Sequence, residues 1–502
     1  MDRLFQFMDF PIIIDIPVLG IPPPMPPAAA ARLTLDFGFF VCDEKAMKQM
    51  LGLKGSSSYH PCGCCANVIG RCDPDAVEAP FVHFTCPSPD QWDLWTFDRF
   101  QEACNLVRTA WDESDARGAE MEMVLGIQFC HGLSMHFTPR AAVARVPESI
   151  CWDAQHVIWA SGGVSQYEAN QFLHALIEGG VGVLHIENLI QQVTHTGRRR
   201  FTRPLSERMV SGDGAHLRAF ADEMICVVAC LTIICEMVLE PLGAMPGHVA
   251  CMRLLFTIQC LVLMGDRALP HMQLLDELLE AHHILFLGLY PRCAKPKLHY
   301  MRHLAKMWRR FGAVVTCFSA ERHHRHAKRC AAFTYNRMDE TVTKRNVVQR
   351  LEYLRGSAFS AVKLGRIYER TGRRANRFRR LLEESGLRGL SRSSSMRTAV
   401  RLWSSGDFIL CQRDVPAANG VSWAGCIAVE FWSTRDSPDH FMVAEQCDLV
   451  AAPNDNGTNW LYRRTRTHMV VHHNRLLMSC SWLVERDQIR VALPMYARRI
   501  LG

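Results

Sequence analysis

Residues 43–65 read DEKAMKQMLGLKGSSSYHPCGCC, and this stretch ends in a loop rich in Gly, Ser and Cys. Cys62 and Cys65 are separated by two residues, and two thiolates at this spacing on a turn form half of a tetrahedral zinc site. Cys64 and Cys72 leave the choice of local ligands open. The loop therefore needs a second pair of ligands to complete such a site.

The residues before this stretch predict a strand that ends close to an acidic side chain. Residues 33–41 are rich in Phe and aliphatic side chains and predict a buried strand, and Asp43 follows it closely. Residues 44–53 predict a short helix, and the Pro- and Ala-rich residues 1–32 predict an irregular segment. Asp43 is therefore a candidate catalytic residue at a strand end.

A pair of histidines far along the chain has the spacing of metal ligands. Residues 295–304 read KPKLHYMRHL, and His299 and His303 are four apart. On a helix they share one face and can bind one metal ion. The alternative is a helix that carries two exposed or buried histidines without a metal.

Two further strings carry acids in settings that suit metal or phosphate chemistry. Residues 152–163 read WDAQHVIWASGG and contain Asp153 and His156 on adjacent turns, although most such pairs are structural. Residues 309–321 read RRFGAVVTCFSAE and place Glu321 at a predicted strand-to-helix junction beside basic residues. A Mg²⁺-binding acid of a phosphoryl-transfer site suits that position, and the alternative is a Glu that caps a basic helix.

The middle of the chain is helical and apolar. Residues 213–296 predict helices with breaks at Pro241, Pro246 and Pro270, whereas residues 181–186 are a strand candidate. The apolar runs 224–239 and 252–264 are shorter than the ~20 residues that span a bilayer, and both contain polar residues. We therefore expect buried helices and no membrane partner; a helical membrane protein ranks last among the alternatives.

The positive charge is concentrated in one block. Residues 295–397 hold 26 Lys or Arg against 7 Asp or Glu, a balance of 26 − 7 = +19, so the rest of the chain sums to 7 − 19 = −12. This is typical of a surface that binds a polyanion such as double-stranded DNA, and the alternative is a solvated helical face. The densest group consists of Arg373, Arg374, Arg377, Arg379 and Arg380.

The cysteine usage and the last hundred residues complete the outline. The 21 Cys are odd in number and have no repeated spacing, which favours reduced thiols in the nucleus or cytosol. Residues 341–400 predict basic helices that end in a Ser-rich linker at 391–395. Short β-type runs separated by turn residues predict a small β-barrel-like domain at 401–502.

The order of these strings resembles the transposases of the CACTA (En/Spm-like, plant transposon protein 2) group and, more distantly, the Transib and V(D)J recombinase lineage. In those families a Cys-x-x-Cys follows an acid after about 20 residues, and here 62 − 43 = 19. A His pair precedes the last acid by a similar distance, and here 321 − 303 = 18 and 321 − 299 = 22. The resemblance covers about residues 33–335.

The resemblance implies an α/β RNase H-like core that is interrupted by an all-α insertion and followed by the small, mostly β C-terminal domain. The implied divisions are 1–32, 33–212 with the Cys-x-x-Cys loop, 213–296 as the insertion, 297–340 as the end of the core, 341–400 and 401–502. In this family three acids hold two Mg²⁺ or Mn²⁺ ions that cleave DNA and transfer strands. The protein is expected to assemble on DNA as a homo-oligomer in the nucleus.

The resemblance also assigns roles to the candidate residues. Asp43 matches the second acid and Glu321 the third, and both are implied magnesium ligands. Asp153 and His156 match a signature that shapes the site and contacts the scissile phosphate. The implied structural zinc ligands, which tie the two parts of the core together, are Cys62, Cys65, His299 and His303.

One departure from the family concerns the first acid. It is expected on a strand well upstream of Asp43, but only 42 residues precede Asp43, and Asp15 leaves little room because 43 − 15 = 28. The sequence therefore predicts an N-terminally truncated or decayed transposase that binds DNA without nicking it. Metal-dependent cleavage that is lost in Glu321→Gln would contradict this. A non-catalytic DNA-binding protein that keeps the zinc scaffold is the competing hypothesis.

Overall fold

The structure is a computed structural model, and it describes most of the chain with gaps. The described residues are 12–13, 32–33, 40–42, 44–45, 51–129, 146–160, 162–193, 204–212, 214–317, 363–364, 367–368, 373–384, 387–397, 402–413, 421–434, 440–453, 457–485 and 488–501. The chain divides into two compact units. Unit 1 comprises Met1–Asp153 and Lys295–Phe311, and unit 2 comprises Ala154–Ala294 and Gly312–Gly502.

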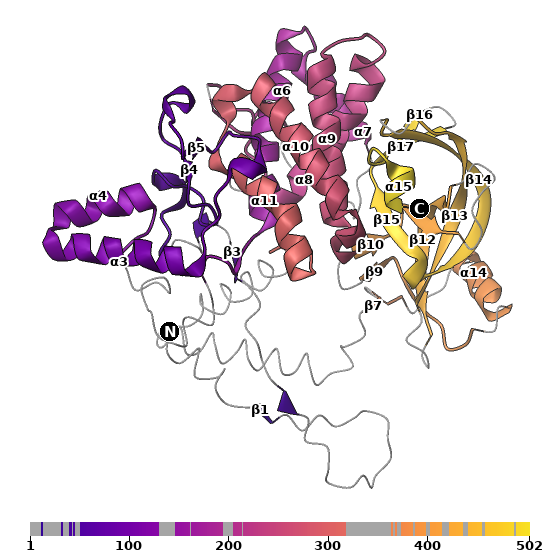
Figure 1. Ribbon diagram of the computed structural model, residues 1–502. Helices are drawn as coiled ribbons and strands as arrows, with labels where there is room; N and C mark the ends of the chain where they lie inside the picture. The colour runs from indigo at the N-terminus through magenta and orange to yellow at the C-terminus, as the bar shows by residue number, and fades with distance from the viewer. Residues whose placement is uncertain are drawn as a thin grey trace, which may run out of the picture. The chain divides into compact units, whose positions relative to one another are not determined.

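Unit 1 is built from short strands, loops and three helices in its described part (Figure 1). Its strands form two-stranded sheets: β1 (Ile12–Ile13) with β2 (Arg32–Leu33), β3 (Phe40–Cys42) with β6 (Ile150–Trp152), and β4 (Val68–Ile69) with β5 (Val82–His83). Single 3₁₀ turns lie at η1 (Gly55–Ser57), η2 (Pro74–Ala76) and η3 (Pro89–Gln91). Strands this short bury little apolar surface, so unit 1 depends on contacts between its loops and helices.

Helices α3 (Phe97–Glu113) and α4 (Asp115–Leu125) form an antiparallel pair in unit 1. The Thr96 side chain caps α3 by accepting from the Arg99 amide, and Ser114 caps α4 in the same way. The buried residues of α3 recur at helical spacing along one face: Phe100, Ala103, Cys104, Val107 and Ala110. Gly126, with a φ of 70°, ends α4 in the left-handed conformation that favours glycine.

Strands β3 and β6 pair in parallel, with Cys42 opposite Trp152. Helix α11 (Pro296–Phe311) packs against β6, and the Trp152 amide donates to the Met307 sulfur at 3.5 Å. The Tyr300 ring stacks on Trp152 with centroids 3.9 Å apart. The α/β RNase H-like core stays a prediction.

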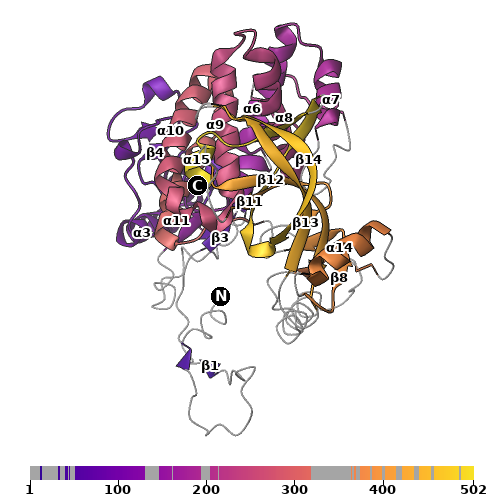
Figure 2. The same cartoon turned by 90° about the vertical axis from the view of Figure 1, so that its right-hand side faces the viewer.

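The first part of unit 2 is a helical bundle (Figures 1 and 2). Its described elements are η5 (Gln155–Trp159), α6 (Val164–Glu178), α7 (Val183–Gln192), α8 (Ala221–Ile234), η7 (Cys235–Leu239), α9 (Pro246–Leu263), η8 (Gly265–His271), α10 (Met272–Leu289) and η9 (Pro291–Cys293). The chain turns just before Pro241, and α9 begins at Pro246, because proline lacks the amide that a helix interior needs. These breaks lie where the sequence predicted them.

The apolar runs of the sequence form the centre of this bundle. Twelve of the fourteen residues of α8 are buried, and within the bundle the Trp159 indole donates to Gln259 at 2.9 Å. The Gln259 amide in turn donates to the Ile225 carbonyl at 2.9 Å. One described helix, α9, is long and apolar enough to cross a membrane by length and composition, and 61% of that window is buried inside the protein.

The second part of unit 2 is an antiparallel sheet of eight strands in its described residues (Figure 2). The strands are β8 (Ser391–Ser393), β11 (Phe408–Gln412), β12 (Trp423–Ser433), β13 (His440–Ala451), β14 (Asn459–His472), β15 (Leu476–Cys480), β16 (Trp482–Glu485) and β17 (Gln488–Ala492). The order is β15-β11-β12-β13-β14-β17-β16, with β8 added to β12. Only Ser481 separates β15 from β16, so the two ends of this order meet and the sheet curls on itself.

Smaller elements flank this sheet. They are β7 (Lys363–Leu364), α14 (Arg373–Glu384), β9 (Ser395–Arg397), β10 (Leu402–Ser404), η11 (His473–Arg475) and α15 (Ala497–Leu501). Helix α14 is anchored by Phe378 and Leu382, which pack in one apolar cluster with Trp432 and Val443 of the sheet. The sheet region therefore includes residues upstream of 401, where the sequence placed its start.

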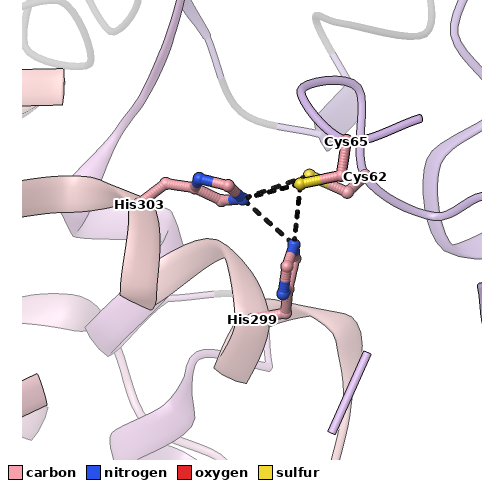
Figure 3. A group of neighbouring side chains, drawn as sticks. All are labelled: Cys62, Cys65, His299 and His303. Atoms are coloured by element: carbon pink, nitrogen blue, oxygen red, sulfur yellow. Dashed lines mark hydrogen bonds between the residues drawn. The ribbon is translucent and has the colours of Figure 1, made fainter. Parts of the chain in front are cut away.

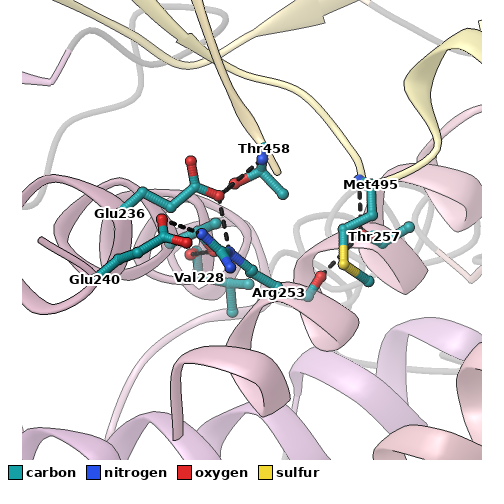
Figure 4. Close-up of polar contacts among 8 residues, drawn as sticks. Val228, Glu236, Glu240, Arg253, Thr257, Thr458 and Met495 are labelled. Carbon is teal, nitrogen blue, oxygen red and sulfur yellow. Dashed lines mark hydrogen bonds and ion pairs between the residues drawn. The ribbon is translucent and has the colours of Figure 1, made fainter. Parts of the chain in front are cut away.

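The helices and the sheet of unit 2 are joined by buried polar contacts (Figure 4). The Arg253 guanidinium lies between Glu236, at 2.9 Å, and Glu240, at 2.5 Å. Glu236 also accepts from the Thr458 amide, at 2.8 Å, and from its hydroxyl. The Met495 amide donates to the Thr257 hydroxyl at 3.0 Å. The Glu236 and Thr257 contacts hold η7 and α9 against the residues next to β14 and β17 of the sheet.

Two local predictions are wrong. Residues 181–186 do not form a strand: most of them lie in or beside helix α7, whose buried Ile186 and Ile190 are four apart. The predicted linker at 391–395 is occupied by β8 and the start of β9. Serine has no strong preference for strands. The extended conformation arises here because β8 pairs with β12 and β9 pairs with β10.

Candidate metal centre

The predicted Cys and His pairs converge in unit 1 (Figure 3). His299 and His303 lie on one face of α11, while Cys62 and Cys65 lie on the turn between η1 and β4. All four side chains are buried, and one potential ligand atom from each lies within 4.8 Å of the others. The convergence confirms that residues separated by up to 241 positions form one cluster.

The separations between the four potential ligand atoms fit a tetrahedron. The sulfur-to-nitrogen distances are 3.5 Å from Cys62 to His303 and 3.4 Å from Cys65 to each histidine, and the two Nε2 atoms are 3.0 Å apart. With zinc bonds of about 2.3 Å to sulfur and about 2.0–2.1 Å to nitrogen, the corresponding edges are about 3.6 Å and about 3.3 Å. The cluster therefore has the size and the donor set of a structural zinc site.

Backbone contacts fix the turn that carries the two cysteines. The Cys64 amide donates to the Cys62 sulfur at 3.4 Å, which orients that sulfur toward the cluster. The Trp95 amide donates to the Cys64 carbonyl at 3.0 Å, and Cys65 forms a bridge with Leu94. Cys64 and Cys72, which the sequence left as alternatives, are not members of the cluster.

Aromatic residues that the sequence did not single out support the cluster. The Trp92 ring lies edge-on to His299, with centroids 4.5 Å apart, and 5.2 Å from His303. The Tyr300 hydroxyl donates to the Pro61 carbonyl at 2.7 Å, which ties α11 to the cysteine turn. Neither residue belongs to a recognisable sequence motif. Each one contacts a segment that is far away in the chain, and such a contact leaves no local pattern.

The surroundings of the cluster favour a thiolate at Cys62 but not at Cys65. Burial raises the pKa of the Cys62 thiol, but hydrogen bonds with Cys64 and Cys65 and the imidazoles of His303 and His299 outweigh burial, so this pKa lies well below its ordinary value. Burial and the neighbouring Cys62 raise the pKa of Cys65. Burial lowers the pKa of His299. A thiolate beside a neutral imidazole is the ligand state that a zinc ion needs.

The remaining candidates are not members of this cluster or lie outside the described residues. Asp153 is buried and directly follows β6, and His156 is half-buried in η5. Asp43 and Glu321 lie outside the described residues.

The basic helix is described only in part. In α14, Arg380 is exposed and Arg379 is half-buried, whereas the side chains of Arg373, Arg374 and Arg377 lie outside the description. No disulfide links any of the cysteines that the structure describes.

A comparison with protein-family models finds none that matches the chain. A comparison with curated proteins finds no match either.

Proposed function

We propose that this chain is a transposase-derived protein of the DDE class that binds double-stranded DNA through a core stapled by zinc. The convergence of Cys62, Cys65, His299 and His303 carries the proposal. The sequence motifs that resemble the CACTA transposases require these four residues to meet, although they come from two distant segments. Assembly as a homo-oligomer on DNA and a nuclear location stay predictions of the same resemblance.

Zinc is the proposed occupant because the donor set is two sulfurs and two imidazole nitrogens, all buried. A site with four protein ligands has no open position for a substrate, so its role is structural. The zinc would join α11 to the cysteine turn, and α11 packs against β6. We call this zinc link between Cys62, Cys65, His299 and His303 the staple. It connects the Cys-x-x-Cys loop to the strand that precedes Asp153.

The register of β3 and β6 supports a metal-dependent nuclease site in unit 1. Cys42 and Trp152 are partners in these parallel strands, and Asp43 and Asp153 are the next residues in the sequence. Parallel strands present their carboxyl ends at the same sheet edge, and two carboxylates at one edge suit Mg²⁺ or Mn²⁺. We propose that Asp43, which lies outside the described residues, shares this edge with Asp153 and that Asp153 is a further metal-binding acid. The resemblance adds Glu321 to the set.

The first experiment measures nicking of supercoiled plasmid by the full chain with Mg²⁺ or Mn²⁺. The proposal expects metal-dependent nicking that falls at least about 100-fold in Asp153→Asn and in Glu321→Gln, which corresponds to about 2.7 kcal/mol in the barrier. Glu120→Gln is the control, since Glu120 is exposed on α4. DNA binding without nicking in the wild type would contradict this nuclease site and would match the decayed transposase that the sequence predicted.

The second experiment tests the basic block through the salt dependence of DNA binding. Each phosphate contact contributes about −0.9 to the slope of log affinity against log salt concentration. Arg380→Gln removes an exposed charge from α14 and should reduce the steepness of this slope by about one. Arg117→Gln, an exposed arginine on α4 outside the block, should leave the slope unchanged. Salt-insensitive binding would contradict the proposal.

A further inference from the structure

A second cluster of potential metal ligands lies inside the helical bundle of unit 2. It consists of Glu168 on α6, Cys251 on α9 and His282 on α10, and one donor atom from each lies within 4.8 Å of the others. Glu168, Cys251 and His282 are completely buried. The His282 Nε2 lies 2.7 Å from a carboxylate oxygen of Glu168. The three residues join helices that are distant in sequence, since 251 − 168 = 83 and 282 − 251 = 31.

The surroundings of this cluster make a buried carboxylate costly. The neighbouring positions of α9 and α10 are apolar and buried, among them Met252, Leu255 and Leu279. The second oxygen of Glu168, Oε1, has no hydrogen-bond partner among the described residues. A carboxylate in such a place requires a cation or a full set of donors, because desolvation strongly disfavours an isolated charge.

A further polar group lies near the cluster. The Tyr290 hydroxyl is buried and has no hydrogen-bond partner among the described residues. Burial, together with Glu168 and Cys251, raises the pKa of this hydroxyl, so it stays a neutral donor near neutral pH. The bundle therefore concentrates potential ligands and donors at one point of an apolar core.

We propose that Glu168, Cys251 and His282 bind a second divalent cation of the zinc class. A thiolate, a carboxylate and an imidazole are donors that zinc accepts, and Oε1 of Glu168 is available as a fourth. One thiolate and one carboxylate balance the two positive charges, so the loaded site is neutral inside the apolar bundle. Because Glu168, Cys251 and His282 are completely buried, the ion would be structural, holding α6, α9 and α10 together.

The competing state is a metal-free hydrogen-bonded pair. In that state the His282 ring nitrogen donates to Glu168 at the 2.7 Å of the structure, Cys251 stays a thiol and no ion is bound. The two states differ in metal content, which can be measured directly.

The experiment measures how many zinc ions the full chain holds. The protein is first loaded with zinc and then passed through a gel-filtration column in buffer that contains a weak chelator. The proposal expects two zinc ions per chain in the wild type and one in Cys251→Ala. Cys260→Ala should keep two, because Cys260 is a buried thiol on the same helix that is not a member of the cluster. Cys62→Ala should also hold one ion, which tests the staple of unit 1 independently.

The outcomes separate this inference from the proposed function. One zinc in the wild type that is lost in Cys62→Ala but kept in Cys251→Ala overturns the second site and leaves the staple intact. The reverse pattern overturns the staple and supports the second site. If Cys251→Ala does not fold, Glu168→Gln provides the test: removal of a ligand charge should weaken the second ion at least about tenfold, because even residues that only support a ligand cost 10–100-fold. Unchanged affinity overturns the proposal.

Discussion

The two ligand clusters of this protein lie in contrasting surroundings. The Cys62–His303 cluster lies among two-residue strands, loops and the helix α11, beside the buried ring of Trp92. The Glu168–His282 cluster lies at the centre of α6, α9 and α10, where most neighbouring side chains are buried and apolar. The first ligand set therefore links short elements from distant parts of the chain, whereas the second lies inside a bundle of long helices that pack on one another.

The largest effect should follow removal of the staple in unit 1. Cys62→Ala removes one of the four ligands, and structural zinc contributes about 10–16 kcal/mol of apparent binding free energy in small zinc peptides. This is as large as the whole ~5–15 kcal/mol stability of a typical domain. We therefore expect amide hydrogen exchange over residues 51–129 to become fast, while residues 221–289 stay protected.

The matched control for this variant is Cys72→Ala, because Cys72 is half-buried and is not a member of the cluster. It should retain both the zinc and the slow exchange. Slow exchange of residues 51–129 in Cys62→Ala would show that unit 1 does not depend on the staple, and the contrast between the two units would then fail.

An intermediate effect should follow a cavity in the helical bundle. Leu255→Ala on α9 truncates a side chain that is completely buried, and such changes cost about 2–5 kcal/mol. Chemical denaturation followed by the circular dichroism of the helices should show this loss of stability. The proposed zinc ion of unit 1 should be retained. Leu242→Ala is the control, since Leu242 is 73% exposed and should change stability by no more than about 0.5 kcal/mol. Equal effects of the two variants would contradict a tightly packed bundle.

The smallest effect should follow loss of one hydrogen bond beside the staple. Tyr300→Phe keeps the ring that stacks on Trp152 but removes the hydroxyl that donates to Pro61. A buried carbonyl left without a donor costs about 1–3 kcal/mol. The denaturation midpoint of unit 1 should therefore fall modestly, and the proposed zinc ion should be retained. Tyr59→Phe, at an exposed tyrosine of the same loop, should have no measurable effect. Loss of zinc in Tyr300→Phe would make this contact part of the staple itself.

The sequence predicted the Cys62–His303 cluster but contained no sign of the Glu168–His282 cluster. The reason is that only the first cluster is built from pairs of residues that are close together in the sequence. Cys62 and Cys65 are separated by two residues and His299 and His303 are four apart, so each pair has the spacing that one turn or one helix face imposes. The resemblance then supplied the expectation that the pairs meet. Glu168, Cys251 and His282 are single residues on three helices, and no spacing relates them.

The sequence by itself determined the elements whose cause is local. The prolines at 241 and 246 end and begin helices because of their missing amides, and the apolar runs of α8 and α9 are buried as their composition requires. The spacing alone left Cys64 and Cys72 open, and the tertiary structure confirmed that Cys62 and Cys65 face the histidines, as the resemblance implied. It also decided that residues 391–393 are a strand, because the partner strand β12 supplies the hydrogen bonds. Contacts between distant segments have no local signature, so these features required the folded chain.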